Sequence, residues 1–251
     1  IEAEKLSHSV VRQIEQLILR GILRPGERLP SERELSERFG VSRPSLREAV
    51  AELQERGLLA TRAGAGIYVA DVLGSAFSPA LIQLIASHEE AVFDYIAFRR
   101  DLESIAAERA ALHGSDTDLK VIDTIFRKME AAHRKRNPAD EAELDAEFHI
   151  AILEASHNVI LLHMMRSIFD LLKRGVFFNR QRMFKQRTTR DLLLDHHRKI
   201  NDALQARDPA TARAAVEEHL TYVESQLGDL KKAAKNEAVA RMRYAHEQES
   251  G

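Results

Sequence analysis

The sequence predicts a mainly α-helical protein of two domains, a small N-terminal unit of three helices and a β-hairpin, and a C-terminal all-α helical bundle. Its 251 residues are too many for one ordinary domain and comfortable for two. Apolar side chains recur every three to four residues over most of the chain, which is the period of an amphipathic helix. Only 11 glycines and 6 prolines are present, which indicates short loops. We place the N-terminal domain at residues 1–71, a linker at 72–79, the bundle at 80–234 and a polar tail at 235–251.

The first three predicted helices are bounded by local signals. The first covers residues 6–20, with an apolar face of Leu6, Val10, Ile14, Leu17 and Ile18. Ser31 and Glu34 form a capping box that opens the second helix, which ends at Gly40. Ser42 is the N-cap of the third. Two helices separated by so tight a turn form a helix-turn-helix.

A β-hairpin is predicted after the third helix ends at Gly57. Residues 58–62 and 67–69 have the composition of short strands, and Gly64 to Gly66 supply the turn. Three helices followed by a hairpin make a winged helix-turn-helix. The rest of the chain is predicted as helices near residues 80–87, 89–113, 116–136, 139–156, 159–181, 185–206 and 209–234.

Composition limits the kinds of function. The chain has 37 Lys and Arg against 39 Asp and Glu, a net charge of −2, so any DNA binding must come from a local patch of positive charge. The absence of Cys excludes a disulfide framework, a Cys-based zinc finger and a thiol nucleophile, and it suits a cytoplasmic location. No apolar run approaches the ~20 residues of a membrane span, so no membrane partner is expected.

The third helix is the candidate for DNA recognition. Arg43 and Arg47 are four residues apart and share one face, and Arg is the best bidentate partner of guanine. Hydroxyl groups at the helix start can bond phosphate oxygens, and a glycine lets the wing approach the DNA backbone. The candidate DNA contacts are Arg33, Ser42, Arg43, Ser45, Arg47 and Gly64. The competing interpretation is that these arginines form ion pairs on a solvated face.

Two segments of this domain resemble the GntR family of transcription regulators. They are Leu23–Leu35 (LRPGERLPSEREL) and Val41–Ala49 (VSRPSLREA). The resemblance implies DNA contacts for Arg33, Ser42, Arg43, Arg47 and Gly64. The wing departs from the family pattern, because Ala63 and Ala65 stand where glycines are usual.

Four residues of the bundle are candidate metal ligands. Asp145 and His149 are four residues apart on one helix face. His197 and His219 each lie eleven residues from Asp208, so in an antiparallel helical hairpin both sit ~16 Å from the turn and can face each other. Three imidazoles and one carboxylate suit a divalent metal with open positions, zinc first, with nickel, manganese or iron as alternatives. The competing interpretation is four separate hydrogen-bonded core or surface residues.

Residues 80–228 resemble the helical effector domain of the FadR-type branch of that family. Its metal-binding version has Asp-x₃-His and two later histidines, which match Asp145, His149, His197 and His219. The segment Phe98–Glu103 matches an Arg-x-x-Leu-Glu motif, and the resemblance implies that Arg99 pairs with the carboxylate of an effector. A surface ion pair of Arg99 with Glu103 is the alternative.

The effector expected from this chemistry is a small carboxylate. An α-hydroxy or α-keto acid can chelate a metal through one carboxylate oxygen and the adjacent oxygen. Segments 155–163, 169–174 and 183–187 resemble the lactate-, pyruvate- and glycolate-responsive regulators.

The sequence therefore predicts a homodimeric DNA-binding regulator, a repressor rather than an enzyme, on a pseudo-palindromic operator of double-stranded DNA. One alternative keeps the DNA-binding domain but gives it a structural metal and a different effector, such as an acyl-CoA, a dicarboxylate or a sugar acid. The other alternative is a metal-dependent enzyme that uses the same four ligands.

Overall fold

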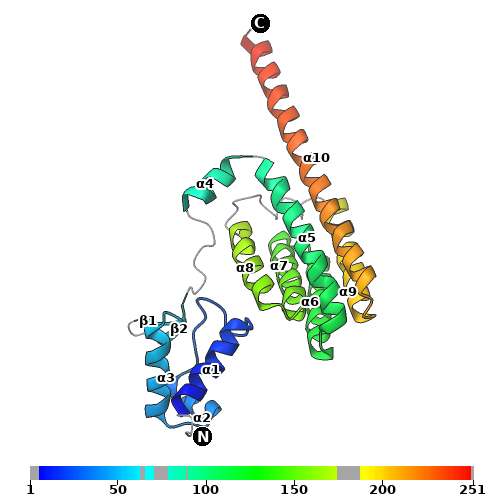
Figure 1. Cartoon of the computed structure of the whole chain (residues 1–251). Coiled ribbons are helices and arrows are strands. Elements are labelled where there is room, and N and C mark those ends of the chain that lie inside the picture. Colours follow the sequence, from blue (N-terminus) through cyan, green and yellow to red (C-terminus); the bar gives the residue numbers. More distant parts are fainter. Residues whose placement is uncertain (1–5, 63–65, 71–78, 89, 174–186, 250–251) are drawn as a thin grey trace. The chain divides into compact units, whose positions relative to one another are not determined.

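A computed structural model describes residues 6–62, 66–70, 79–88, 90–173 and 187–249. Over these residues the chain forms ten helices and one small antiparallel sheet, so the predicted mainly α fold is confirmed (Figure 1). The chain divides into two compact units, one of Ile1–Ala76 with Leu162–Ser167, and one of Phe77–Leu161 with Ile168–Gly251. The first boundary lies between Ala76 and Phe77. That division falls within the predicted linker, which lies largely outside the described residues and stays a prediction.

The N-terminal unit is a winged helix-turn-helix. Its elements in chain order are α1 (Leu6–Leu19), α2 (Glu32–Phe39), α3 (Arg43–Glu55), β1 (Leu59–Arg62) and β2 (Gly66–Val69). The two strands pair antiparallel, with Leu59 opposite Val69 and Arg62 opposite Gly66. The tight turn between α2 and α3 fixes the direction of α3 relative to α2.

The ends of α2 and α3 are capped as predicted. The Ser31 hydroxyl accepts from the Glu34 amide at 3.3 Å, and the Ser31 amide donates to the Glu34 carboxylate at 2.9 Å. Gly40 ends α2 in the left-handed conformation with φ 64°, which costs Gly little. Ser42 then accepts from the Ser45 amide and starts α3. These bonds satisfy backbone groups that a helix end leaves without partners.

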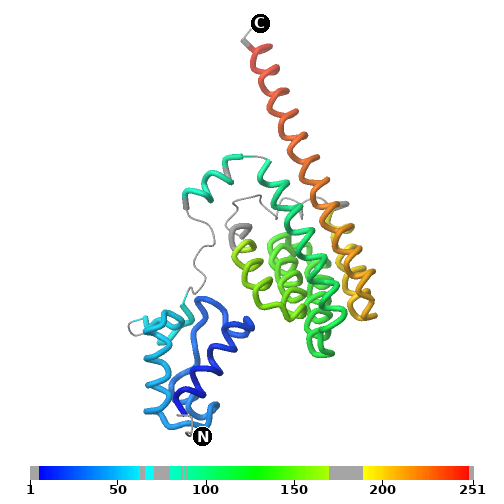
Figure 2. Tube along the Cα trace, viewed as in Figure 1, coloured from blue at the N-terminus to red at the C-terminus, as the bar shows by residue number. Residues whose placement is uncertain are grey.

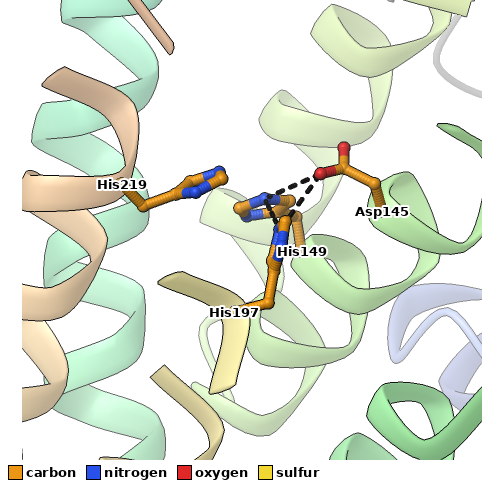
Figure 3. Close-up of side chains that lie close together, drawn as sticks. All are labelled: Asp145, His149, His197 and His219. Carbon is orange, nitrogen blue, oxygen red and sulfur yellow. Dashed lines mark hydrogen bonds and ion pairs between the residues drawn. The ribbon is translucent and has the colours of Figure 1, made fainter. Parts of the chain in front are cut away.

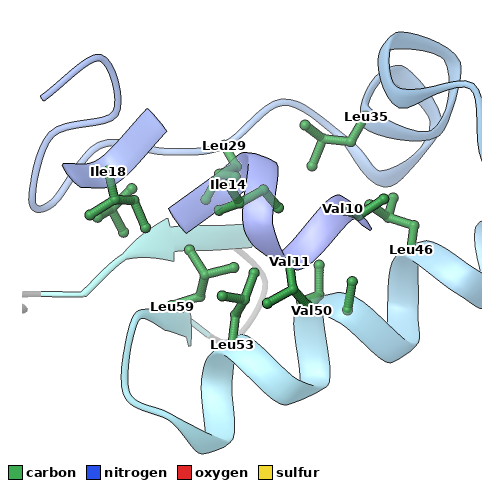
Figure 4. Close-up of a cluster of buried hydrophobic side chains, with 12 residues drawn as sticks. Val10, Val11, Ile14, Ile18, Leu29, Leu35, Leu46, Val50, Leu53 and Leu59 are labelled. Atoms are coloured by element: carbon green, nitrogen blue, oxygen red, sulfur yellow. The ribbon is translucent and has the colours of Figure 1, made fainter. Parts of the chain in front are cut away.

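A single apolar cluster holds the unit together (Figure 4). Ile14 of α1 and Leu46 and Leu53 of α3 are completely buried. Residues of α2, β1 and β2 close the cluster, so the wing and the helix-turn-helix share one core. Burial of each of these side chains contributes roughly 1.5–3 kcal/mol, which fixes α3 on the unit.

The wing is also bonded to a segment that the sequence did not mark as a strand. The Leu29 amide donates to the Ile67 carbonyl at 2.9 Å, and the Val69 amide donates to the Glu27 carbonyl at 2.9 Å. The segment is too short, and too close to Pro25 and Pro30, to show a strand pattern in the sequence. Its bonds attach the wing to the body of the unit.

The C-terminal unit is entirely helical in its described residues (Figure 2). Its elements are α4 (Pro79–Ser87), α5 (Glu90–His113), α6 (Asp116–Lys135), α7 (Pro138–Ala155), α8 (Val159–Lys173), α9 (Arg187–Gln205) and α10 (Pro209–Glu249). Helix α5 packs against α7 and α10, and α9 packs against α6 and α10. No helix in the described part of the chain is both long enough and apolar enough to cross a bilayer.

One helix differs from its predicted range, and the predicted end of another is not tested. Helix α10 was expected to end near residue 234, but it continues to Glu249, so most of the predicted polar tail is helical. Residues 229–249 contain no Pro or Gly and many strong helix formers (Ala, Lys, Arg and Glu), which explains the extension. The described part of α8 ends at Lys173, and the expected continuation to residue 181 lies outside the described residues.

Candidate functional site

The first turn of α3 presents two exposed arginines. The Nε of Arg47 donates to a carboxylate oxygen of Glu32 at 2.9 Å, although two thirds of the Arg47 side chain is exposed. Arg43 is exposed and pairs with no carboxylate among the described residues. Exposed ion pairs contribute little free energy, about 0–1 kcal/mol, so Arg47 can exchange Glu32 for another partner at low cost.

Of the other four predicted DNA contacts, three lie on α2 or at the start of α3, and one lies outside the described residues. Arg33 on α2 is strongly exposed, with its Nε 3.6 Å from an oxygen of Glu37. The hydroxyls of Ser42 and Ser45 are 3.0 Å apart at the start of α3. Gly64 lies outside the described residues. The structure therefore places five of the six residues on α2 or at the start of α3, and leaves their contacts with DNA a prediction.

A hollow of about 490 Å³ lies between α3 and the wing. Its lining includes Arg28, Glu32, Arg47, Gln54, Thr61 and Gly66. A Cβ on Gly66 would stand 3.1 Å from the Nε of Arg28, and the φ of 101° there strains any other residue. Sequence reasoning missed Arg28 as a candidate, although it lies within the first segment that resembles the GntR family.

Asp145, His149, His197 and His219 converge inside the C-terminal unit (Figure 3). They come from α7, α9 and α10, and one possible ligand atom of each lies within 4.8 Å of the others. All four side chains are buried. The Nε2 of His197 is 3.0 Å from an Asp145 oxygen and 3.4 Å from the Nε2 of His149. The predicted set is therefore brought together around one point.

The outer nitrogens of two of these histidines are held by hydrogen bonds. The Nδ1 of His149 is 2.7 Å from an oxygen of Glu103, and the Nδ1 of His197 is 2.6 Å from the carbonyl oxygen of Leu193. Because those oxygens accept, each Nδ1 bears a proton, and each Nε2 faces the cluster. Metal-binding histidines typically have this arrangement. Sequence reasoning missed that Glu103 contacts His149.

The donor set fits a divalent metal ion. The Nδ1 of His219 is buried and has no hydrogen-bond partner among the described residues. Burial, together with His197 and His149, holds the pKa of His219 well below its ordinary value, so the ring is neutral at pH 7 and can bind a cation. Three imidazoles and one carboxylate in a buried site are ligands that suit zinc and related metals.

Arg99 is buried and paired, which differs from the exposed ion pair considered as its alternative role. Its Nε lies 2.5 Å from one oxygen of Glu103, and its guanidinium carbon lies 4.8 Å from the centre of the Phe169 ring. Burial would raise the pKa of Glu103, but Arg99 and His149 lower it to about 2, so Glu103 is a carboxylate at neutral pH. Glu103 thus links Arg99 to the cluster, because it pairs with Arg99 and also contacts His149.

Both units match described families. Residues 6–69 match the family described as "Bacterial regulatory proteins, gntR family", and residues 94–222 match the "FCD domain". The second match contains the whole cluster as well as Arg99 and Glu103.

Three curated relatives align over most of the chain. The "Glc operon transcriptional activator" of Escherichia coli (strain K12) is 32% identical over 91% of this chain and 91% of its own. The "Putative L-lactate dehydrogenase operon regulatory protein" of the same strain is 34% identical over 89% of this chain and 86% of its own. The "HTH-type transcriptional regulator LutR" of Bacillus subtilis (strain 168) is 32% identical over 84% of this chain and 96% of its own.

A solved structure has the same fold. The Streptococcus agalactiae GntR structure superposes with a TM-score of 0.56 at 27% identity, and the match covers 88% of this chain and 99% of that one. The relatives are named as transcriptional regulators, so the chain is a regulator and not an enzyme. This chain belongs to the GntR family of bacterial regulatory proteins, in the FadR-type branch that joins a DNA-binding winged helix-turn-helix to an FCD domain.

Proposed function

We propose that this regulator is a repressor whose operator binding is controlled by a small α-hydroxy or α-keto acid, bound at a divalent metal in the FCD domain. The observation that supports this most strongly is the buried cluster of Asp145, His149, His197 and His219, with two outer nitrogens already hydrogen-bonded. Three imidazoles and one carboxylate that converge on one point in a buried site form a ready set of ligands for a cation.

The DNA-binding part of the proposal rests on exposure and charge. Arg43 and Arg47 contact bases in the major groove, while Arg33, Ser42 and Ser45 contact phosphates and Gly64 brings the wing to the backbone. A homodimer places two α3 helices about 34 Å apart, one turn of DNA, on a pseudo-palindromic operator.

The metal and the effector share one site in this proposal. When bound, the metal, with zinc as the first choice, supplies a positive charge and open coordination positions for the carboxylate and the adjacent oxygen of the acid. Asp145 and the three histidines hold it, and Glu103 orients His149. Arg99 attracts the effector carboxylate and shares its charge between that group and Glu103.

The effector class is supported by chemistry and by one relative. A chelating hydroxy acid matches a metal with open positions. The name of the L-lactate dehydrogenase operon relative refers to an enzyme of such an acid. The "Glc operon" relative is named an activator, so the direction of control in this chain has to be measured on its own operator.

Elemental analysis followed by a thermal-shift screen tests the proposal. We expect one divalent metal per chain, and an increase in melting temperature with lactate, pyruvate or glycolate that disappears in metal-free protein. Citrate and an acyl-CoA serve as the comparison compounds. Stabilisation by acyl-CoA alone, or equal stabilisation of metal-free protein by lactate, would show that the metal is structural and the effector is of another class.

A further inference from the structure

A second hollow, of about 290 Å³, lies where the end of α6 meets the start of α9. It is lined by His133, Arg134, Arg136, Arg190 and Asp191, and it shares no residue with the metal cluster. We refer to it as the arginine hollow. Neither the DNA-binding residues nor the cluster gives it a role.

Arg190 is held rigidly at this hollow. Its side chain is buried, its Nε donates to both oxygens of Glu141 at 3.0 Å, and its Nη2 donates to Glu141 at 2.6 Å and to the His133 carbonyl at 2.8 Å. Its Nη1 donates to no acceptor among the described residues. A guanidinium fixed on one side presents its remaining donors in a set direction, which favours recognition of an oxyanion.

Two further arginines of the hollow have no carboxylate partner. Arg134 and Arg136 are exposed, and neither forms an ion pair with any described residue. Most arginines on the surface of the same unit do: the pairs are Arg127–Asp123, Arg198–Glu130, Arg207–Asp116 and Arg213–Glu108, at 2.7 to 3.3 Å. Arg136 also adopts φ 56° at the end of α6, where Gly or Asn is usual. Arg207 adopts a similar φ of 52° but pairs with Asp116, so the distinguishing feature of Arg134 and Arg136 is the lack of a carboxylate partner.

One carboxylate lines the hollow together with its three arginines. It belongs to Asp191, which lies 3.0 Å from the Nε2 of His133. Glu141, which is not part of the lining, pairs with Arg190. The hollow therefore has more guanidinium groups than carboxylates, and Arg134 and Arg136 form no ion pair with a described residue.

We propose that the arginine hollow binds a compact dianion, either a phosphate group or a dicarboxylate. Its volume lies at the lower end of the roughly 300–1,000 Å³ of small-molecule pockets, which suits a compact ligand rather than a nucleotide. Both ligand types offer the paired oxygens that match guanidinium donors. A smaller cavity lined by His133, Arg190 and His197 adjoins the hollow, so the test must separate this site from the metal cluster.

Calorimetric titration of the full chain with inorganic phosphate, and separately with succinate, tests the proposal. We expect one saturable site per chain for at least one of the two anions, and the anion that binds identifies the ligand class. Arg134→Gln with Arg136→Gln should weaken that binding at least about tenfold, because two charge-assisted contacts are lost. The matched control is Arg127→Gln, which removes an exposed and paired arginine of the same helix and should leave the affinity unchanged.

A variant without the metal cluster completes the design. His197→Ala with His219→Ala should keep the same anion affinity, because the hollow contains neither residue. Loss of anion binding in that variant would place the anion at the metal cluster and overturn the proposal. Absence of saturable binding by either anion, or equal weakening by Arg127→Gln, would overturn it as well. Both α6 variants change exposed side chains, so unchanged thermal unfolding confirms that the fold is intact.

Discussion

The arginines of α3 and the histidines of the FCD domain lie at opposite extremes of exposure. Two thirds of the Arg47 side chain is exposed and it has one surface partner, whereas His149 and His197 are about 1% exposed and have partners at both ring nitrogens. The first group can change partner at low cost, and the second cannot move without the loss of buried hydrogen bonds. Exposed arginines can replace water with DNA as their partner. Buried side chains that are held in place suit the selective binding of an ion.

This difference predicts how substitutions act. A change on the exposed surface should alter DNA binding and leave folding intact. A change at the buried cluster should alter ligand binding and stability together.

Removal of two ligands should have the largest effect. His197→Ala with His219→Ala leaves one imidazole and one carboxylate, too few to hold a structural or effector-binding ion. We expect loss of bound metal and of the thermal shift with lactate, with helical circular dichroism retained. Stoichiometric metal in the purified double variant would contradict the proposed site.

Glu103→Gln should affect both stability and metal affinity. The change leaves the charge of Arg99 buried without its partner, which costs about 3–5 kcal/mol of stability. It also weakens the hydrogen bond that orients His149, and loss of such a bond typically lowers metal affinity about 10–100-fold. Glu224→Gln is the matched control, because Glu224 pairs at 2.7 Å with the adjacent Arg100 where both side chains are about 30% exposed. That control should lose less than about 1 kcal/mol in urea unfolding. Equal losses in the two variants would mean that burial does not distinguish these pairs.

The same carboxylate predicts an acid dependence of stability. The pKa of Glu103 is about 2 in the folded protein and 4.5 in its ordinary state, so its contribution is complete above pH 4.5 and is lost as the pH falls toward 2. The full contribution is about 3 kcal/mol. Unfolding of metal-free protein between pH 5 and pH 3, followed in urea, should show a steeper loss of stability in the wild type than in Glu103→Gln.

Changes in α3 should have smaller effects, confined to DNA. Arg43→Ala and Arg47→Ala should each weaken specific operator binding by ~1–3 kcal/mol if the side chains contact guanine. Urea unfolding should stay within about 0.5 kcal/mol of the wild type, because both side chains are exposed. Arg56→Ala, at the far end of α3, is the control and should leave the affinity unchanged. Unchanged operator affinity in both the Arg43 and Arg47 variants would show that α3 does not contact the bases.

Local signals explain what the sequence could predict in the N-terminal unit. Ser31 with Glu34, Gly40 and Ser42 are each recognisable within four residues, so the ends of α2 and α3 were predicted correctly. The pairing of residues 27–29 with β2 could not be predicted, because it depends on how distant segments meet.

The cluster was predictable for a different reason. Asp145 and His149 lie one helical turn apart, and His197 and His219 are equally spaced from the turn at Asp208, so helix geometry indicated two pairs. The resemblance to the metal-binding effector domain joined the two pairs into one set. The contact of Glu103 with His149 joins α5 to α7 and has no such local rule. The buried state of Arg99 was missed for the same reason, since its sequence spacing from Glu103 is equally typical of a surface pair.

Operator affinity shows whether a metal-bound acid controls DNA binding. An operator duplex selected from random sequences can be titrated by fluorescence anisotropy with metal-loaded and metal-free protein, each with and without saturating L-lactate. We predict that lactate weakens operator binding of metal-loaded protein at least about fivefold, the lower end of typical allosteric coupling, and has no effect on metal-free protein. The same affinity with and without lactate in metal-loaded protein, or an equal change in both forms, would contradict the account.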